Sequence, residues 1–172
     1  MDKAYDHKKT EDRIYKFWEE KDYFKPEVNP KGEPYCIILP PPNANAPLHF
    51  GHAMYVTEDI LVRYHRMNGE KTLWLPGADH AGFETQFVFE QKLKKEGKSR
   101  FDYDRETLYK MISDYVSDNR PIMEGQLRRL GFSLDWSRSK FTLDTDIVTV
   151  VYKTFKRLFD DGLVYRAERL VN

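Results

Sequence analysis

The sequence predicts an α/β fold in which a parallel β-sheet comes first and a helical extension follows. Two short apolar runs, residues 35–39 and 71–75, are typical of buried strands, and the residues between them show helical periodicity. A strand, a helix and a strand within about 40 residues form a βαβ unit, which should be parallel and right-handed. Two longer helical patterns in the second half of the chain predict the extension.

The N-terminal part is expected to run from a helix through a loop into the first strand. Thr10 can cap a helix whose apolar face includes Phe17 and Trp18. Residues 25–34 contain three prolines and a glycine and predict a loop. The strand that follows ends at Pro40-Pro41-Pro42, because proline can neither continue a ladder nor sit inside a helix.

The helix of the βαβ unit should span about residues 51–67 and end at Gly69. The next strand is cut by Pro76-Gly77, and a second helix is predicted at 83–96, before Gly97. The residues expected on the apolar stripe of the first of these helices are Ala53, Val56, Thr57, Ile60, Leu61, Tyr64 and Met67.

The second half should be mainly helical. A long apolar stripe predicts a helix at 105–130, which Pro121 should kink or split and Gly131 should end. A further helix is predicted at 145–161. Residues 163–171 alternate weakly and predict a strand.

Composition excludes several classes of protein. The formal net charge is zero, which argues against non-specific nucleic-acid binding through bulk charge. The single cysteine, Cys36, allows no internal disulfide and no thiolate metal cluster, and we expect it to be a buried strand residue. A polar N-terminus predicts no secretory signal, and no apolar run is long enough to span a bilayer. A cytoplasmic location is expected.

The segment 40–52 joins the first strand to a helix and is the first candidate site. Ligands bind at the carboxyl ends of parallel strands, where helix N-termini attract anions. Gly51 lets a phosphate or ribose approach the backbone, and His49 and His52 can both face one ligand and donate to its phosphate oxygens. The alternatives are a metal pair, for which no other convincing ligand cluster appears, and two unrelated surface histidines.

The segment 77–82 follows the second strand and should lie at the same edge of the sheet. Asp79 is placed to accept hydrogen bonds from a ligand ammonium group, and its alternative role is to cap the helix that follows. His80 could orient Asp79 or a ligand, or could be purely structural. Residues 128–138 suggest a packed corner between two helices, and we expect Arg128 and Arg129, like the lysines of 92–98, to be solvated rather than bound to RNA.

These segments resemble one known family. Leu48-His49-Phe50-Gly51-His52 resembles the HIGH signature of class I aminoacyl-tRNA synthetases. The flanking Pro40-Pro41-Pro42-Asn43 and Gly77-Ala78-Asp79-His80-Ala81-Gly82 are similar to the valyl branch of that family, and similarity extends over the whole chain. The resemblance implies the N-terminal half of a Rossmann-like catalytic domain with a helical extension, covering residues 1–172.

The resemblance also implies roles for individual residues. His49 and His52 would be catalytic and, with Asn43 and Gly51, would bind ATP. Asp79 and the backbone near Pro40 would hold the ammonium group, and Pro41 and Pro42 would wall the side-chain pocket. Magnesium would accompany ATP, and no protein-bound metal such as zinc is expected. The implied reaction is ATP-dependent activation of valine and its transfer to tRNA(Val).

The chain departs from the family pattern in places. Ala44-Asn45-Ala46 lacks the usual glycine, and Phe50 replaces a smaller residue at a position expected to point into the core. A KMSKS-like loop, an editing domain and an anticodon-binding domain have no counterpart in the sequence. We therefore expect a fragment of a longer enzyme, weak or inactive alone, whose exposed apolar surface promotes self-association. A free-standing class I-type nucleotidyltransferase and a non-catalytic synthetase-derived binding module are the alternative functions.

Overall fold

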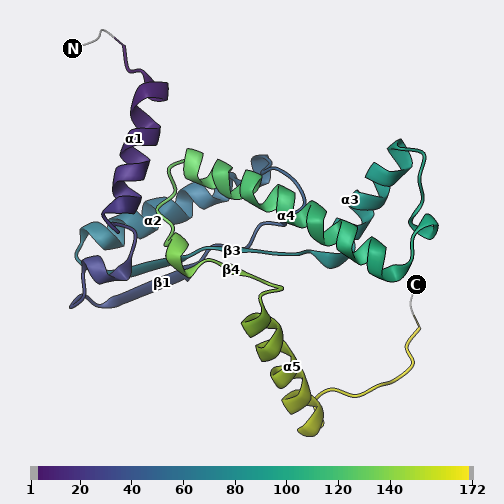
Figure 1. Ribbon diagram of the computed structural model, residues 1–172. Coiled ribbons are helices and arrows are strands. Elements are labelled where there is room, and N and C mark those ends of the chain that lie inside the picture. Colours follow the sequence, from purple (N-terminus) through teal and green to yellow (C-terminus); the bar gives the residue numbers. More distant parts are fainter. Residues whose placement is uncertain (1–3, 171–172) are drawn as a thin grey trace.

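The computed structural model describes residues 4–170, and its centre is the predicted βαβ unit (Figure 1). Strand β1 (Pro34–Ile38) and strand β2 (Lys71–Leu75) pair in parallel, with Cys36 opposite Leu73. Between them run the 3₁₀ helix η2 (Phe50–Met54) and helix α2 (Tyr55–Met67). The two apolar runs are therefore strands, as predicted, and their ends bring residues 40–52 and 77–82 to one edge.

A second pair of short strands continues this edge. Strand β3 (Gly77–Ala78) follows β2 after Pro76 and pairs in parallel with β4 (Lys140–Phe141). These strands could not be predicted from the sequence, because two residues are too few to show alternation. Their pairing places the end of β4 beside Asp79.

The core lies between the β1–β2 sheet, α2 and helix α4 (Arg105–Arg129), with the corner after α4 closing it. Helix α3 (Gly82–Lys95) packs against α4. Pro121 does not split α4, which is one continuous helix, and Gly131 follows it with φ +78°, as a helix end requires. The largest fully buried side chains include Trp74, Leu39, Met123, Leu127, Leu134 and Val62.

Helix α1 (His7–Glu20) begins earlier than predicted. The Asp6 side chain accepts a hydrogen bond from the backbone N–H of Lys9 and caps the helix, so Thr10 lies within the first turns. An aspartate one turn upstream is as good a cap as threonine, and the helix extends to it. Of the face expected to be apolar, Trp18 is partly covered and Phe17 is exposed.

Several side chains expected in the core are exposed. Strand β1 is covered on one face only, so Cys36 and Ile38 point outward from the other. Phe50 is 93% exposed, because it occupies the first turn of η2 and no described element lies over it. The apolar stripe of α2 is likewise outward: Val56, Ile60 and Tyr64 are exposed, and the buried residues of this helix are Tyr55 and Val62.

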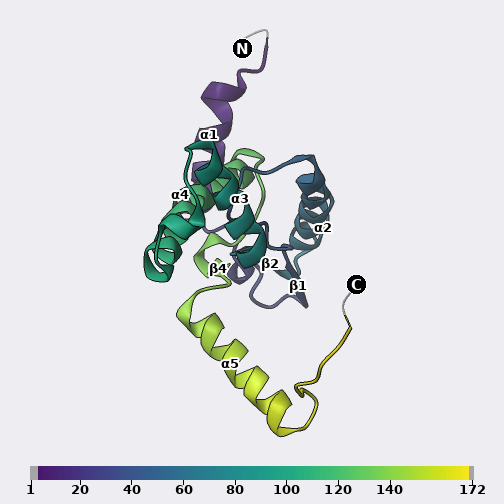
Figure 2. The same ribbon diagram turned by 90° about the vertical axis from the view of Figure 1, so that its right-hand side faces the viewer.

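The C-terminal segment projects from the rest of the chain (Figures 1 and 2). Helix α5 (Thr145–Asp160) forms as predicted, but none of its residues is fully buried. The strand predicted at 163–171 is wrong over its described residues: 163–170 form no ladder, because no described strand edge lies beside them, and Val171 is outside the described residues. Among the described residues, no helix has the length and apolar character needed to cross a membrane.

Candidate active site

The loop 40–52 is held by side chains from two helices. The Tyr55 hydroxyl of α2 donates to the Pro40 carbonyl at 2.7 Å. On α4, the Tyr115 hydroxyl donates to the Asn45 carbonyl at 2.8 Å, and the Gln126 side chain accepts from the Leu48 N–H at 2.6 Å. These contacts fix the loop at three points, although Ala44-Asn45-Ala46 contains no glycine.

The buried Asn45 links this loop to the second segment. Its amide donates to the Thr85 hydroxyl at 3.1 Å, and that hydroxyl donates to the His80 carbonyl at 2.7 Å. The backbones are also paired: the Asp79 N–H donates to the Pro42 carbonyl at 2.9 Å, and the Asp79 carbonyl accepts from Ala44 at 2.8 Å. The two predicted segments therefore form one rigid edge, as expected.

His49 and His52 lie at the mouth of η2, with ring centroids 4.1 Å apart. The Nδ1 atom of His49 accepts from the Gly51 N–H, and the Nδ1 atom of His52 accepts from the His49 N–H, each at 3.0 Å. An imidazole nitrogen that accepts a hydrogen bond carries no proton, so the His49 ring holds its proton on Nε2. Nδ1 of His52 also lies 3.1 Å from the His49 carbonyl. The His49 N–H can only donate and therefore needs Nδ1 of His52 as its acceptor, which favours the same tautomer for His52. Each ring can then donate from Nε2 to an anionic oxygen.

Gly51 has a steric role within this arrangement. A Cβ atom there would lie 2.7 Å from Cε1 of His49, closer than such contacts allow. Glycine is thus needed for the His49 ring to fold back on the turn, a reason that the sequence analysis did not identify.

Asp79 follows β3 and is half-buried. Its Oδ1 atom accepts from the Ala81 N–H at 3.0 Å and from the Thr142 hydroxyl at 3.2 Å. Ala81 is the N-cap residue of α3, in a left-handed conformation with φ 42°. Asp79 therefore holds the residue that precedes α3 but does not cap the helix, which has no side-chain cap, and one carboxylate oxygen stays available to a ligand.

An open cavity of about 400 Å³ brings most of the predicted site residues together. That volume is in the range of small-molecule sites. Gly51 is not among the lining residues, since it lies behind the His49 ring. The predicted residues that line the cavity are Pro40, Pro41, Pro42, Asn43, His49, His52 and Asp79.

Burial changes the chemistry of the cavity wall at Tyr55. Burial raises the pKa of its hydroxyl to about 12, with a smaller contribution from the Glu58 carboxylate. The hydroxyl therefore keeps its proton even in mildly alkaline solution and serves as a hydrogen-bond donor to Pro40. Tyr55, Tyr115, Gln126 and Thr142 support the site but were not predicted, because their contacts span at least 15 positions along the chain.

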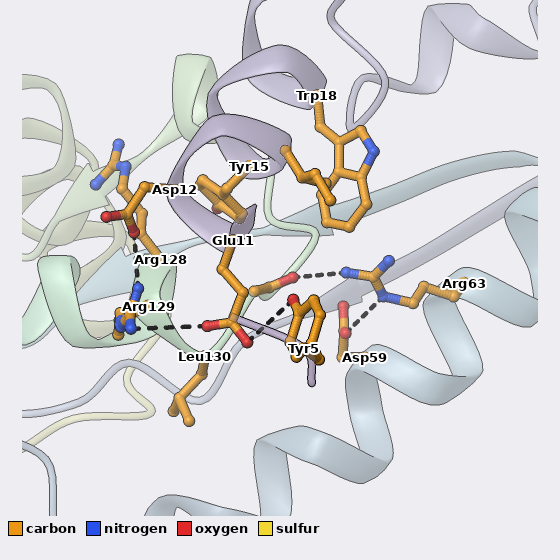
Figure 3. A pocket seen from close by; sticks show the side chains of 12 residues that line it. Tyr5, Glu11, Asp12, Tyr15, Trp18, Asp59, Arg63, Arg128, Arg129 and Leu130 are labelled. Carbon is orange, nitrogen blue, oxygen red and sulfur yellow. Dashed lines mark hydrogen bonds and ion pairs between the residues drawn. The ribbon is translucent and has the colours of Figure 1, made fainter. Parts of the chain in front are cut away.

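The corner after α4 is packed, as predicted, but its arginines are not simply solvated. Arg129 pairs with Asp12 at 2.8 Å and with Glu11 at 3.7 Å, both on α1 (Figure 3). Arg128 pairs with Glu19 and lies 3.8 Å from the centre of the Trp136 ring. A cavity of about 410 Å³ lies here between α1, α2 and the end of α4. The three arginines that line it each pair with a carboxylate of α1 or α2.

The residues described contain no group of three or more His, Cys, Asp or Glu side chains that could hold a metal ion. His49 and His52 therefore have no third ligand in this part of the chain. The metal-pair alternative receives no support from the geometry, and the donor pattern of the two rings suits an anion.

Known proteins similar to this chain share its fold and much of its sequence. The family of class I tRNA synthetases (I, L, M and V) matches residues 13–172. The valine–tRNA ligase of Dehalococcoides mccartyi strain CBDB1 is 46% identical over 100% of this chain and 20% of its own length. The chloroplastic/mitochondrial valine–tRNA ligase 2 of Arabidopsis thaliana is 48% identical over 95% of this chain and 17% of its own.

A solved structure supports the architecture. The LeuRS chain in a ternary complex with tRNA and LeuAMS, from Agrobacterium radiobacter K84, matches with a TM-score of 0.78 and 23% identity over 96% of this chain and 19% of that one. This likeness concerns the fold alone. The chain spans about a fifth of the length of the curated relatives it matches.

Proposed function

The chain belongs to the class I tRNA synthetases, and from this membership we propose that it supplies the first half of a site that activates valine with ATP. The observation that carries the proposal is one cavity lined by His49 and His52 on one side and Asp79 on the other. Binding of ATP requires hydrogen-bond donors for its phosphate oxygens. Binding of an amino acid requires an acceptor for its ammonium group. Residues 1–172 would be the N-terminal part of the catalytic domain.

In the proposed reaction each residue that lines the cavity has one role. The valine ammonium binds the Asp79 carboxylate, and the valine side chain packs against Pro41 and Pro42. A carboxylate oxygen of valine attacks the α-phosphorus of ATP, the bond from that phosphorus to the bridging oxygen breaks, and pyrophosphate leaves. The Nε2–H groups of His49 and His52 donate to phosphate oxygens as negative charge grows on them.

In this proposal ATP is a substrate, and the magnesium ion is bound to ATP. Asn43 is exposed at the cavity, where its amide can contact the nucleotide. Magnesium would arrive with ATP and neutralise phosphate charge, since this part of the chain offers no cluster of ligands for it. The valyl group would then pass to the terminal adenosine of tRNA(Val), and AMP would leave.

Two alternatives remain as outcomes of the test. A free-standing nucleotidyltransferase is disfavoured, because the family match covers residues 13–172. A non-catalytic binding module would keep the fold but would bind neither substrate.

The test is a titration of the isotope-labelled chain with ATP–magnesium, and separately with valine or leucine, followed by NMR. We expect weak ATP binding that shifts the His49 and His52 resonances and is lost in His52→Ala. His7→Ala is the matched control, since His7 is exposed on α1, far from the cavity. Binding of neither ATP nor valine would refute the proposal and favour the binding module. Valine-dependent ATP–pyrophosphate exchange should be slow or absent in this chain alone.

A further inference from the structure

Thr142 brings a hydroxyl group to the proposed ammonium site from a distant part of the chain. It follows β4, and its N–H donates to the Ala78 carbonyl of β3 at 3.2 Å. Its Oγ1 atom lies 3.2 Å from Oδ1 of Asp79, 2.5 Å from Nδ1 of His80 and 2.9 Å from the His80 backbone nitrogen. One hydroxyl thus contacts both polar side chains of the second segment.

The three contacts allow one assignment of protons. A hydroxyl donates one hydrogen bond and accepts two. The His80 backbone N–H can only donate, and an ionised Asp79 carboxylate can only accept. All three contacts are hydrogen bonds only if the Thr142 proton points to Asp79 and Nδ1 of His80 carries the proton that the hydroxyl accepts. His80 is then the opposite tautomer from His49 and His52, whose Nδ1 atoms are acceptors.

This hydrogen-bond network uses Oδ1 of Asp79 and leaves Oδ2 for a ligand. Oδ1 receives the Ala81 N–H and the Thr142 hydroxyl, and Nδ1 of His80 lies 3.4 Å away. No side chain among the described residues forms a hydrogen bond with Oδ2 of Asp79. A carboxylate anchored at one oxygen cannot rotate freely, so its second oxygen keeps one direction.

The geometry assigns Thr142 as a positioning residue for amino-acid binding: its hydroxyl aims Asp79 at the ligand ammonium and sets the tautomer of His80. This assignment rests on the proposed function of Asp79. The backbone of Thr142 already pairs with β3, so the fold does not depend on the hydroxyl. Valine has nearly the same shape as threonine and therefore removes the hydroxyl while keeping the strand.

The experiment compares the wild-type chain with Thr142→Val, Thr142→Ser and a matched control, Thr149→Val, at an exposed position of α5. The first readout is the His80 tautomer, measured by long-range ¹H–¹⁵N NMR at about pH 8, where free histidine is neutral. We expect Nδ1–H in the wild-type chain, in the serine variant and in the control, and loss of this preference in Thr142→Val.

The second readout is binding. Thr142→Val should raise the dissociation constant for valine about tenfold, as expected for loss of a hydrogen bond to a charged group, and Thr142→Ser should restore it. The dissociation constant for ATP should stay within about twofold, because His49 and His52 do not contact Thr142. If Thr142→Val does not fold, Thr142→Ala makes the same comparison.

Two results would overturn the assignment: an unchanged His80 tautomer in Thr142→Val, or unchanged valine affinity in that variant. A wild-type chain that binds neither ATP nor valine would instead refute the proposed function. The tautomer measurement still decides where the Thr142 proton lies, because it needs no ligand.

Discussion

At the scale of single residues, Asp59 ties α2 to the corner after α4. Its carboxylate is largely buried and accepts from the Ser133 N–H at 2.9 Å, from the Ser133 hydroxyl at 2.6 Å and from Arg63 at 2.7 Å. We predict that Asp59→Ala lowers the free energy of unfolding by about 2–4 kcal/mol, because it leaves buried donors unpaired. Urea denaturation would measure this, with exposed Asp118→Ala as the control. A loss no larger than that of the control would contradict the prediction.

A second prediction concerns pH. Tyr15 is buried, donates to the Phe132 carbonyl and accepts from the Trp136 indole, each at 2.8 Å. Burial is the main cause that raises its pKa from 10.0 to about 12. Above pH 10 the unfolded chain releases this proton while the folded chain keeps it, so stability falls as pH rises towards 12.

The slope from this one group is about 1.4 kcal/mol per pH unit. Tyr15→Phe should remove that part of the alkaline slope while lowering stability at neutral pH by about 1–2 kcal/mol through the lost hydrogen bonds. Denaturation curves recorded between pH 8 and about pH 11 would measure both effects. Tyr109→Phe, at an exposed position, should change neither. Equal alkaline slopes in wild type and Tyr15→Phe would contradict the assignment.

The residues of the candidate site could be predicted better than their surroundings. His49, His52 and Asp79 line one cavity, as the pattern of two strand ends indicated. Phe50 and Cys36 were expected to be buried and are exposed, because burial depends on which elements cover a position and sequence periodicity does not reveal this. Thr142 could not be predicted, since its contact with Asp79 joins positions 63 residues apart.

At the scale of elements, the sequence periodicity predicted helix α2 correctly but predicted the wrong buried face for it. The helix was predicted within a few residues, but the side that faces the corner after α4 carries Asp59, Arg63 and Arg66. Arg63 donates to the Gly131 carbonyl at 2.6 Å and Arg66 to the Ser133 carbonyl at 3.2 Å. Polar side chains thus satisfy the backbone of the corner after α4, and the apolar stripe faces outward.

Pro121 allows a prediction about α4. It lies within the helix, where it cannot donate to the Ser117 carbonyl, between Tyr115 and Gln126, which both hold the site loop. Pro121→Ala should raise the free energy of unfolding by about 1–3 kcal/mol, because it restores a helix hydrogen bond. Thermal unfolding would measure the gain, and Asp118→Ala on the same helix should change stability by no more than about 0.5 kcal/mol. Destabilisation would mean that the contacts of Tyr115 and Gln126 require a proline-bent helix.

At the scale of the whole molecule, the parallel βαβ unit and the order of helices could be predicted because each rests on local patterns. The β3–β4 pairing and the absence of a strand at 163–170 could not be predicted, since a strand exists only where a partner edge is present. The same reasoning explains α5, an amphipathic helix that packs on nothing among the described residues (Figure 2). The sequence periodicity of α5 predicts a buried face, but residues 4–170 do not bury any residue of this helix.

The exposed face of α5 leads to a prediction about the chain in solution. Val151, Phe155 and Phe159 are each more than half exposed on one side of the helix. A contiguous apolar face in water favours association, so the apparent mass should rise with protein concentration in sedimentation or light scattering. Phe155→Lys should weaken this association about tenfold, because it removes the burial of one large apolar side chain. Thr149→Lys adds the same charge at an exposed polar position of α5 and should leave association nearly unchanged. A monomer at all concentrations, or equal effects of the two lysines, would show that the α5 face does not mediate association.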